Sequence, residues 1–118
     1  MNNSDLKEEI IKLKQSDKLI IVEGKKDKAA LEKLGVGNIF TLSKKPLFHV
    51  IEEIAGAGKG VVILTDLDRH GKELYGRLNS GLQYHGVKVD NKFREFLFKK
   101  TKLRQIEGLY NHIRRNST

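Results

Sequence analysis

Short apolar runs alternate with amphipathic segments along this chain. Residues 19–22 (LIIV) and 60–64 (GVVIL) are apolar throughout, which is typical of strands buried on both faces of a parallel sheet. Two shorter segments, 38–42 (NIFTL) and 87–89 (VKV), predict two further strands. Helical spacing of the apolar positions predicts helices at 4–16, 25–34, 43–56, 71–84, 91–100 and 109–115.

This alternation of strand and helix indicates an α/β protein. Parallel strands joined by helices form right-handed crossovers, which place helices on both faces of the sheet. The expected fold is a small Rossmann-like three-layer sandwich with about four mostly parallel strands. The sequence contains no internal repeat or linker, so residues 1–118 are predicted to form a single domain.

Composition narrows the class of protein further. The chain has 118 residues, of which 38% are hydrophobic and 32% charged, a globular balance. No apolar run approaches the ~20 residues of a membrane span. The first ten residues carry acids and no apolar segment, so we expect no signal peptide and a cytoplasmic location. The absence of cysteine excludes disulfides, thiol catalysis, iron–sulfur clusters and cysteine-bound zinc.

The positive charge is concentrated near the C-terminus. The net charge is +8, and residues 88–118 contribute nine basic and three acidic side chains to it. A basic helical segment at 91–118 indicates a polyanionic partner, most readily RNA or DNA. The same charges would also suit a solvated helix surface with no partner, and charge alone does not decide between these two interpretations.

Acidic side chains follow two of the predicted strands. Glu23 comes directly after 19–22, and Asp66 and Asp68 follow 60–64. The carboxyl ends of parallel strands meet at one edge of a sheet, where three carboxylates would repel one another. A divalent cation removes that repulsion, and Mg²⁺ (or Mn²⁺) prefers such oxygen ligands. Asp66 and Asp68 could instead cap a helix or form an Asx-turn.

Glycines next to these acids point to phosphate binding. Gly24 and Gly71 each open a predicted helix, and a helix N-terminus offers amide donors to a phosphate. Cationic side chains in the same two segments could bind phosphates or be ordinary solvated charges; they are Lys25, Arg69 and Lys72.

Together these segments resemble a known family. Residues 21–27 (IVEGKKD) and 64–71 (LTDLDRHG) are similar to the two motifs of the Toprim domain, with the motifs in the correct order over a core at 18–90. That domain is shared by topoisomerases, bacterial primases, a recombination protein, OLD-family nucleases and the ribonuclease that matures 5S rRNA. The chain is most similar to small stand-alone Toprim proteins and to the Toprim half of that ribonuclease. The resemblance implies that Glu23 is a general acid/base, that Asp66 and Asp68 bind Mg²⁺, and that the reaction is at a phosphodiester bond.

Three neighbouring residues have two interpretations each. Asp27 is either a third acidic contact or a first-turn acid that complements the helix dipole. His70 could assist proton transfer or be an exposed loop histidine. Phe98 falls off the helix face shared by Phe93 and Phe96, so it is the better candidate for stacking on a base.

The sequence therefore predicts a Mg²⁺-dependent nuclease acting on structured RNA or DNA. The alternative is a non-catalytic nucleic-acid-binding or assembly module on the same fold, because no second domain is evident to position a substrate. A phospho-acceptor receiver domain is disfavoured because Glu23 and Gly24, instead of two acids, follow the first strand. A haloacid-dehalogenase-type phosphatase is disfavoured because its acidic pair would follow the first strand.

Overall fold

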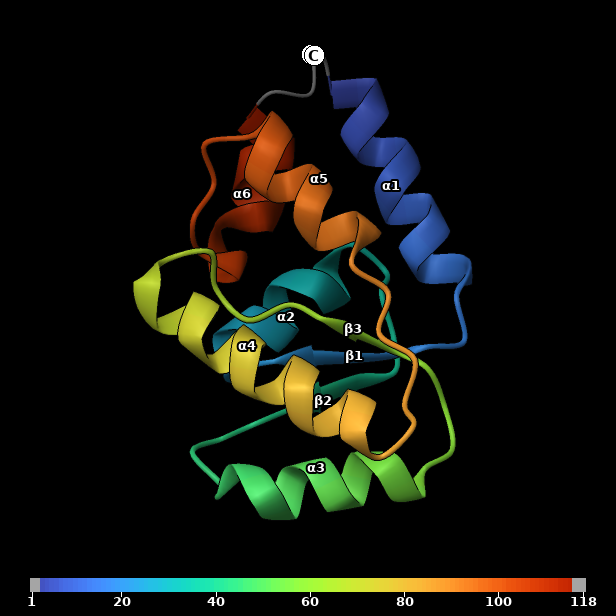
Figure 1. Ribbon diagram of the computed structural model, residues 1–118. Helices are drawn as coiled ribbons and strands as arrows, with labels where there is room; N and C mark the ends of the chain where they lie inside the picture. The colour runs from blue at the N-terminus through green and yellow to red at the C-terminus, as the bar shows by residue number, and fades with distance from the viewer. Residues whose placement is uncertain (1–2, 116–118) are drawn as a thin grey trace.

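Three parallel strands form the centre of the molecule, as the computed structural model of residues 3–115 shows (Figure 1). The strands are β1 (Leu19–Val22), β2 (Ile39–Thr41) and β3 (Val61–Ile63), in the spatial order β2–β1–β3. Ile20 of β1 pairs with Ile39 on one side and with Val62 on the other. The predicted α/β fold with a parallel sheet is confirmed.

The predicted fourth strand at 87–89 is reduced to one bridge. Val89 makes an isolated parallel bridge with Val61. The N–H of Val61 donates to the carbonyl of Lys88 (2.9 Å), and the N–H of Asp90 donates to the carbonyl of Val61 (2.8 Å). Pairing ends there because the next helix begins at Lys92, two residues after Asp90. The sheet therefore has three strands among the described residues, where about four were expected.

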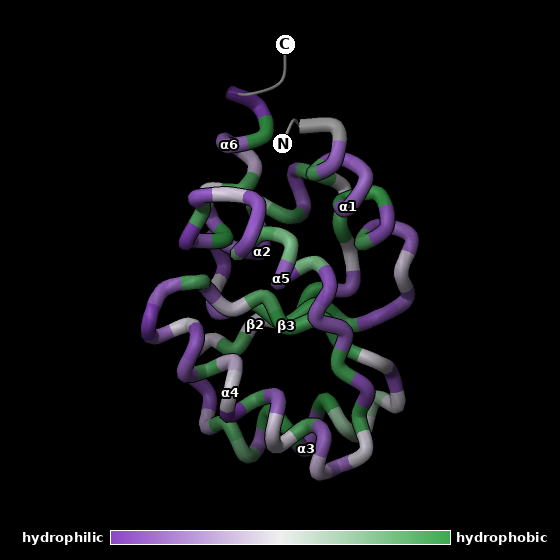
Figure 2. Tube along the Cα trace, turned by 45° about the horizontal axis from the view of Figure 1, so that its top comes forward, coloured by the Kyte–Doolittle hydropathy of each residue, from purple (hydrophilic) through white to green (hydrophobic). Residues whose placement is uncertain are grey.

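Six α-helices and one short 3₁₀ helix surround the sheet in the described part of the chain. They are α1 (Asn3–Gln15), α2 (Lys25–Lys33), α3 (Leu47–Gly56), α4 (Arg69–Tyr84), α5 (Lys92–Lys100), η1 (Ile106–Gly108) and α6 (Leu109–Arg115). Helices α3 and α4 cover one face of the sheet, and α1, α2, α5 and α6 lie on the other (Figures 1 and 2). The molecule is the expected three-layer sandwich.

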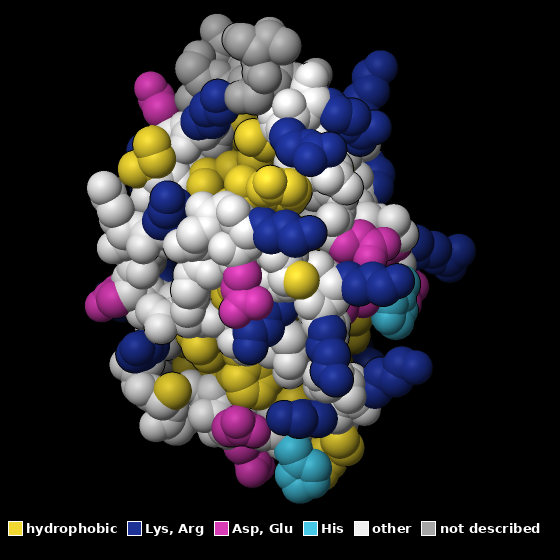
Figure 3. All heavy atoms as spheres, turned by 180° about the vertical axis from the view of Figure 1, so that it is seen from behind, with side chains coloured by type: hydrophobic (Ala, Val, Ile, Leu, Met, Phe, Trp, Pro, Cys, Tyr) yellow, Lys and Arg dark blue, Asp and Glu magenta, His cyan; other side chains and the backbone are white. Residues whose placement is uncertain are grey.

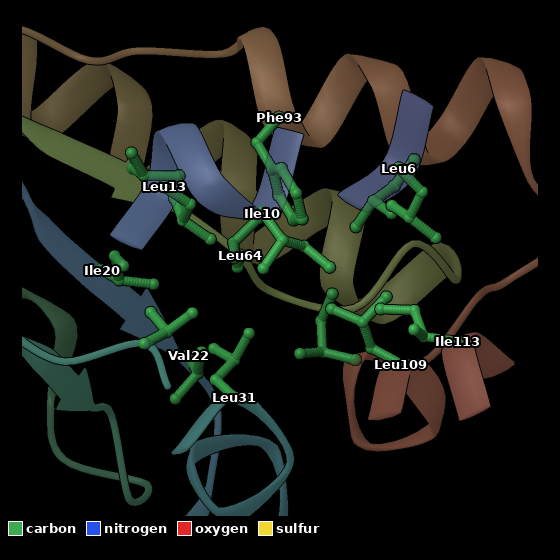
Figure 4. Packing of buried hydrophobic residues seen from close by; sticks show 14 of the residues in the cluster. Leu6, Ile10, Leu13, Ile20, Val22, Leu31, Leu64, Phe93, Leu109 and Ile113 are labelled. Atoms are coloured by element: carbon green, nitrogen blue, oxygen red, sulfur yellow. The ribbon is translucent and has the colours of Figure 1, made fainter. Parts of the chain in front are cut away.

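The alternation of side chains along β1 produces two cores. Ile20 and Val22 belong to the larger core, to which α1, α2, α5 and α6 also contribute (Figure 4). Ile21 points to the opposite face and joins the smaller core with α3 and α4. Each fully buried aliphatic side chain contributes about 1.5–3 kcal/mol relative to exposure, so both layers of helices are held firmly to the sheet.

The strand order opens a crevice at the carboxyl edge of the sheet. From β1 the chain passes through α2 to β2 on one side, and it returns through α3 to β3 on the other side of β1. The segments that leave β1 and β3 therefore diverge. Ligands of open α/β sheets bind at such a reversal of strand order.

Candidate functional site: an acidic cleft between β1 and β3

A cleft of about 690 Å³ lies at this edge of the sheet. Its lining mixes carboxylates with a larger number of cations. The carboxylates are Glu23, Asp27, Asp66 and Glu107, and the basic side chains are Lys25, Lys26, Lys44, Lys45, Arg77 and His70. Figure 3, which shows the molecule from behind, has acidic side chains gathered beside a histidine and bordered by lysines and arginines at its right edge.

Glu23 joins the ends of the two strands. Its Oε2 accepts a hydrogen bond from the backbone N–H of Asp66 (2.7 Å). Its Oε1 lies 3.8 Å from Nε2 of His70, a contact that becomes an ion pair when the histidine is protonated. The structure thus brings Glu23, Asp66 and His70 together in one cleft.

Asp66 is partly buried among other acids. Its Oδ1 accepts a hydrogen bond from the N–H of Ile106 (2.8 Å). Burial raises the pKa of Asp66 to about 6; the Ile106 bond opposes this, and the charges of Asp27, Glu23 and Asp68 add to it. A cation bound here would stabilise the ionised carboxylates against this excess of negative charge.

Asp68 lies outside the cleft lining and caps helix α4. Its Oδ1 accepts a hydrogen bond from the N–H of Gly71 (2.8 Å). A side-chain carbon on Gly71 would lie only 1.9 Å from the carbonyl oxygen of Asp66, so glycine is required for this close approach. The hydroxyl of Thr65 also donates to the carbonyl of Gly71 (2.7 Å). Residues 64–68, between β3 and α4, form the acidic loop. Gly71 lets this loop pack against α4, and the N–H of Gly71 is occupied by Asp68.

Asp27 bonds to the start of helix α2 from within the first turn of that helix. Its Oδ2 accepts a hydrogen bond from the N–H of Gly24 (3.1 Å), the N-cap residue, so this amide is occupied by a carboxylate. Asp27 is buried, and that burial raises its pKa, against the lowering effect of the Gly24 bond and with added repulsion from Glu23 and Glu107. Asp27 therefore both stabilises the helix N-terminus and belongs to the acidic group.

The predicted cations divide between two places. Lys25 lines the cleft. The Arg69 side chain is 95% exposed, and its Nε lies 3.6 Å from Oε1 of Glu73. The Nζ of Lys72 lies 4.6 Å from the ring centre of Phe98. Neither Arg69 nor Lys72 lines the cleft. Sequence reasoning missed four cations of the lining, namely Lys26, Lys44, Lys45 and Arg77. Lys44 sits in a left-handed turn after β2 (φ 61°), a placement that nothing in its sequence context indicates.

Residues from the basic C-terminal segment hold the acidic loop in place. Arg94 is only 7% exposed, and its guanidinium donates to the carbonyls of Thr65 and Asp66 (2.9 Å for the latter). It also lies over the ring of Tyr75, at 4.7 Å from the ring centre. The N–H of Leu67 donates to the carbonyl of Arg104 (2.7 Å). Burial lowers the pKa of Arg94, opposed by the nearby Tyr75, Glu23 and Asp66.

Comparison with known proteins identifies the family. The sequence model of the Toprim domain matches residues 18–93, well over half of the chain. The chain belongs to the Toprim family. Three of the residues that position the Toprim acidic loop, Arg94, Arg104 and Ile106, lie beyond the matched segment.

Relatives of this Toprim protein are small. It is 36% identical over 109 residues to a UPF0292 protein of Methanocaldococcus jannaschii, covering 89% of this chain and 85% of the relative. It is 47% identical over 105 residues to a UPF0292 protein of Pyrococcus abyssi, covering 86% and 79%. A solved structure of a protein from Aquifex aeolicus aligns with a TM-score of 0.80 and 38% identity, over 86% of this chain and 95% of that one.

A Toprim domain indicates a function related to nucleic acid and to a bound metal, typically Mg²⁺. Within residues 3–115, no three acidic or histidine side chains are gathered closely enough to form a ready metal site. The donor chemistry nevertheless fits. In each of the three predicted metal ligands, Glu23, Asp66 and Asp68, one carboxylate oxygen accepts a hydrogen bond from a backbone N–H. The other oxygen accepts no hydrogen bond from the described residues.

No helix within the described residues is long and apolar enough to cross a bilayer.

Proposed function

We propose that this protein is a Mg²⁺-dependent phosphodiesterase of the Toprim type, a nuclease that acts on structured RNA or DNA and also accepts Mn²⁺. One observation carries the proposal. The side chain of Glu23 accepts a hydrogen bond from the backbone N–H of Asp66 where the strand order reverses, and the cleft that contains both carboxylates is bordered by cations. Carboxylates for a metal and cations for phosphates are the two requirements of such a reaction.

The acidic residues have two roles in this proposal. Asp66 and Asp68, with Glu23 beside them, would hold the metal, and Oε1 of Glu23, which lies 3.8 Å from Nε2 of His70, would take up or release the proton. A bound metal would neutralise the charge that develops on the transferring phosphate. The backbone bonds to Glu23, Asp66 and Asp68 fix the direction of each carboxylate before substrate binds.

The cations of the cleft would bind the nucleic-acid backbone. Lys25, Lys44 and Lys45 border the acids and are exposed, so each can reach a phosphate. Arg69 and Lys72 are in the first turn of α4, outside the cleft lining, and would contact phosphates further along the strand. The helix N-termini at Gly24 and Gly71 add positive potential on the same side.

A second candidate is a nucleic-acid-binding module without catalysis. Its support is the absence of three gathered metal ligands among residues 3–115, together with the engagement of Asp68 as a helix cap. Binding would then depend on the lysines of the cleft and on salt concentration, and no turnover would follow.

Cleavage assays separate the two. Purified protein is incubated with end-labelled RNA and DNA hairpins in Mg²⁺, Mn²⁺ or EDTA. We expect metal-dependent cleavage that Glu23→Gln and Asp66→Asn each reduce at least 100-fold. Glu73→Gln is the matched control, because Glu73 is an exposed acid of α4 outside the cleft. Full activity in both variants would refute the proposed roles, and salt-sensitive binding without cleavage would favour the second candidate.

A further inference from the structure

One phenylalanine of α5 lies on the surface, away from both cores. Phe93 is buried in the larger core and Phe96 packs against it. Phe98 is 42% exposed. Phe98 belongs to neither core, so its ring is left for contacts at the surface.

Cations from two other segments lie close to this ring, part of which stays exposed. Nζ of Lys72, on α4, lies 4.6 Å from the ring centre, and Cζ of Arg104 lies 5.1 Å from it. A hollow of about 250 Å³ adjoins the ring, and its lining includes Leu67, Tyr75, Lys72 and Lys99, with Glu95 as its one acid among the described residues. The surface therefore combines an aromatic plane, an apolar hollow and an excess of positive charge.

The hollow lies directly across the acidic loop from the cleft. Leu67 lines the hollow, whereas its neighbour Asp66 lines the cleft. Arg94 lines the hollow as well and donates to the carbonyl of Asp66, so the two sites share one rigid wall. A strand with a phosphate in the cleft could continue over this loop to Phe98.

We propose that Phe98, Lys72 and Arg104 form a stacking subsite for an unpaired base of a nucleic-acid strand. The choice of occupant rests on the proposed function and on charge complementarity: the strand's phosphates match Lys72, Lys99 and Arg104, and its base matches the ring. Every base has a flat π-face, so the subsite tolerates any base. A base within a duplex is stacked between its neighbours and cannot use it, so the subsite selects single-stranded segments beside the reacting phosphate.

Binding in EDTA tests this subsite without cleavage. Fluorescence anisotropy measures the affinity for a labelled 12-nucleotide oligouridylate, the matching oligodeoxythymidylate, and a blunt duplex. We expect Phe98→Ala to weaken binding of both single strands roughly ten-fold or more and to change duplex affinity less than two-fold. Phe98→Tyr, which retains the ring, should bind like the wild type.

Phe48→Ala is the matched control, because Phe48 is 61% exposed on α3. It should change neither affinity. Equal losses on single strands and duplex, an unchanged affinity in Phe98→Ala, or an equal loss in Phe48→Ala would overturn the proposal. A competition experiment with polyglutamate gives one more contrary outcome. The proposal would be overturned if polyglutamate displaced the single strand at the same concentration as unlabelled oligouridylate, from both wild type and Phe98→Ala, since the surface would then bind any polyanion.

This outcome is separable from that of the cleavage assay. If no cleavage is found but Phe98→Ala loses single-strand binding selectively, the subsite stands and the nuclease proposal falls. If Asp66→Asn abolishes cleavage while Phe98→Ala binds normally, the nuclease proposal stands and the subsite falls.

Discussion

Replacing Gly71 with alanine would insert a methyl group into the loop that carries the acidic residues. The new carbon would lie 1.9 Å from the carbonyl oxygen of Asp66 and 2.5 Å from its carbonyl carbon. Both are backbone atoms, and the guanidinium of Arg94 holds that carbonyl in place. The loop and the first turn of α4 must therefore separate.

The cost can be estimated from the contacts that separation breaks. Overpacking costs about 1–3 kcal/mol. The helix cap from Asp68 and the hydrogen bond from Thr65 to Gly71 contribute about 1 kcal/mol each. Alanine recovers about 1 kcal/mol through its higher helix propensity. We expect a net loss of roughly 3 kcal/mol in the free energy of unfolding, which at a urea m-value of about 1.5 kcal/mol/M lowers the midpoint by roughly 2 M.

Urea unfolding followed by circular dichroism measures this loss. Gly76→Ala is the matched control, because Gly76 lies in the same helix and a side-chain carbon there meets no atom within 4 Å. It should gain about 0.5–1 kcal/mol. If Gly71→Ala were as stable as Gly76→Ala, the close approach between Asp66 and Gly71 would be refuted.

Three further predictions concern the charged residues of the site. Because the pKa of Asp66 is about 6 in the folded protein against an ordinary 3.8, the folded state binds more protons between these values and loses stability as pH rises. Asp66→Asn should thus be more stable than wild type by about 1 kcal/mol at pH 7.5 in EDTA, after allowance for partial exposure, and equal to it at about pH 3, below both pKa values. Arg94→Met should lower the free energy of unfolding by roughly 2–4 kcal/mol, because it leaves two carbonyls without a donor, and Arg94→Lys should lose about half as much. The double variant Lys44→Gln/Lys45→Gln should lower the slope of log affinity against log salt by about 1–2 for an RNA hairpin.

Each of these has an outcome that would contradict it. Urea titrations at about pH 3 and at pH 7.5 would contradict the prediction for Asp66→Asn if the variant were less stable than wild type at the higher pH. Thermal melts would contradict the prediction for Arg94→Met if the midpoint temperature of this variant matched that of wild type. An unchanged salt slope would show that Lys44 and Lys45 touch no phosphate.

Local patterns in the sequence predicted the three parallel strands and the helices around them. The apolar runs at 19–22 and 60–64 predicted β1 and β3, because strands buried on both faces contain no polar positions. The segment 87–89 (VKV) was also predicted as a strand, yet it forms only one bridge, with Val61, before the chain turns into α5. The extent of pairing depends on the partner strand, and a local pattern does not contain it.

The candidate site could be predicted only in part, because contacts between distant segments are not contained in a local pattern. Strand order brings Glu23 and Asp66 to one edge of the sheet, as expected of acids that follow two parallel strands. Asp66 and Asp68 were expected to bind Mg²⁺ together, but β3 ends at Ile63 and α4 begins at Arg69, so the two side chains serve different backbone amides.

The contribution of the C-terminal segment was missed. Arg94 lies three residues before Leu97 and next to Phe93, on the buried face of α5. A cation on an apolar helix face was the available signal for a buried guanidinium with specific partners. The bond from the N–H of Ile106 to Asp66 had no such signal, because a backbone amide looks the same in every sequence. The positive charge near the C-terminus is therefore partly structural.

Anomalous scattering from Mn²⁺-soaked crystals tests the central claim most directly. The account predicts an ion bound by Asp66 and Asp68 with Glu23 beside it, and loss of that ion in Asp66→Asn. Occupied Mn²⁺ sites elsewhere on the protein, with none among Glu23, Asp66 and Asp68, would contradict it.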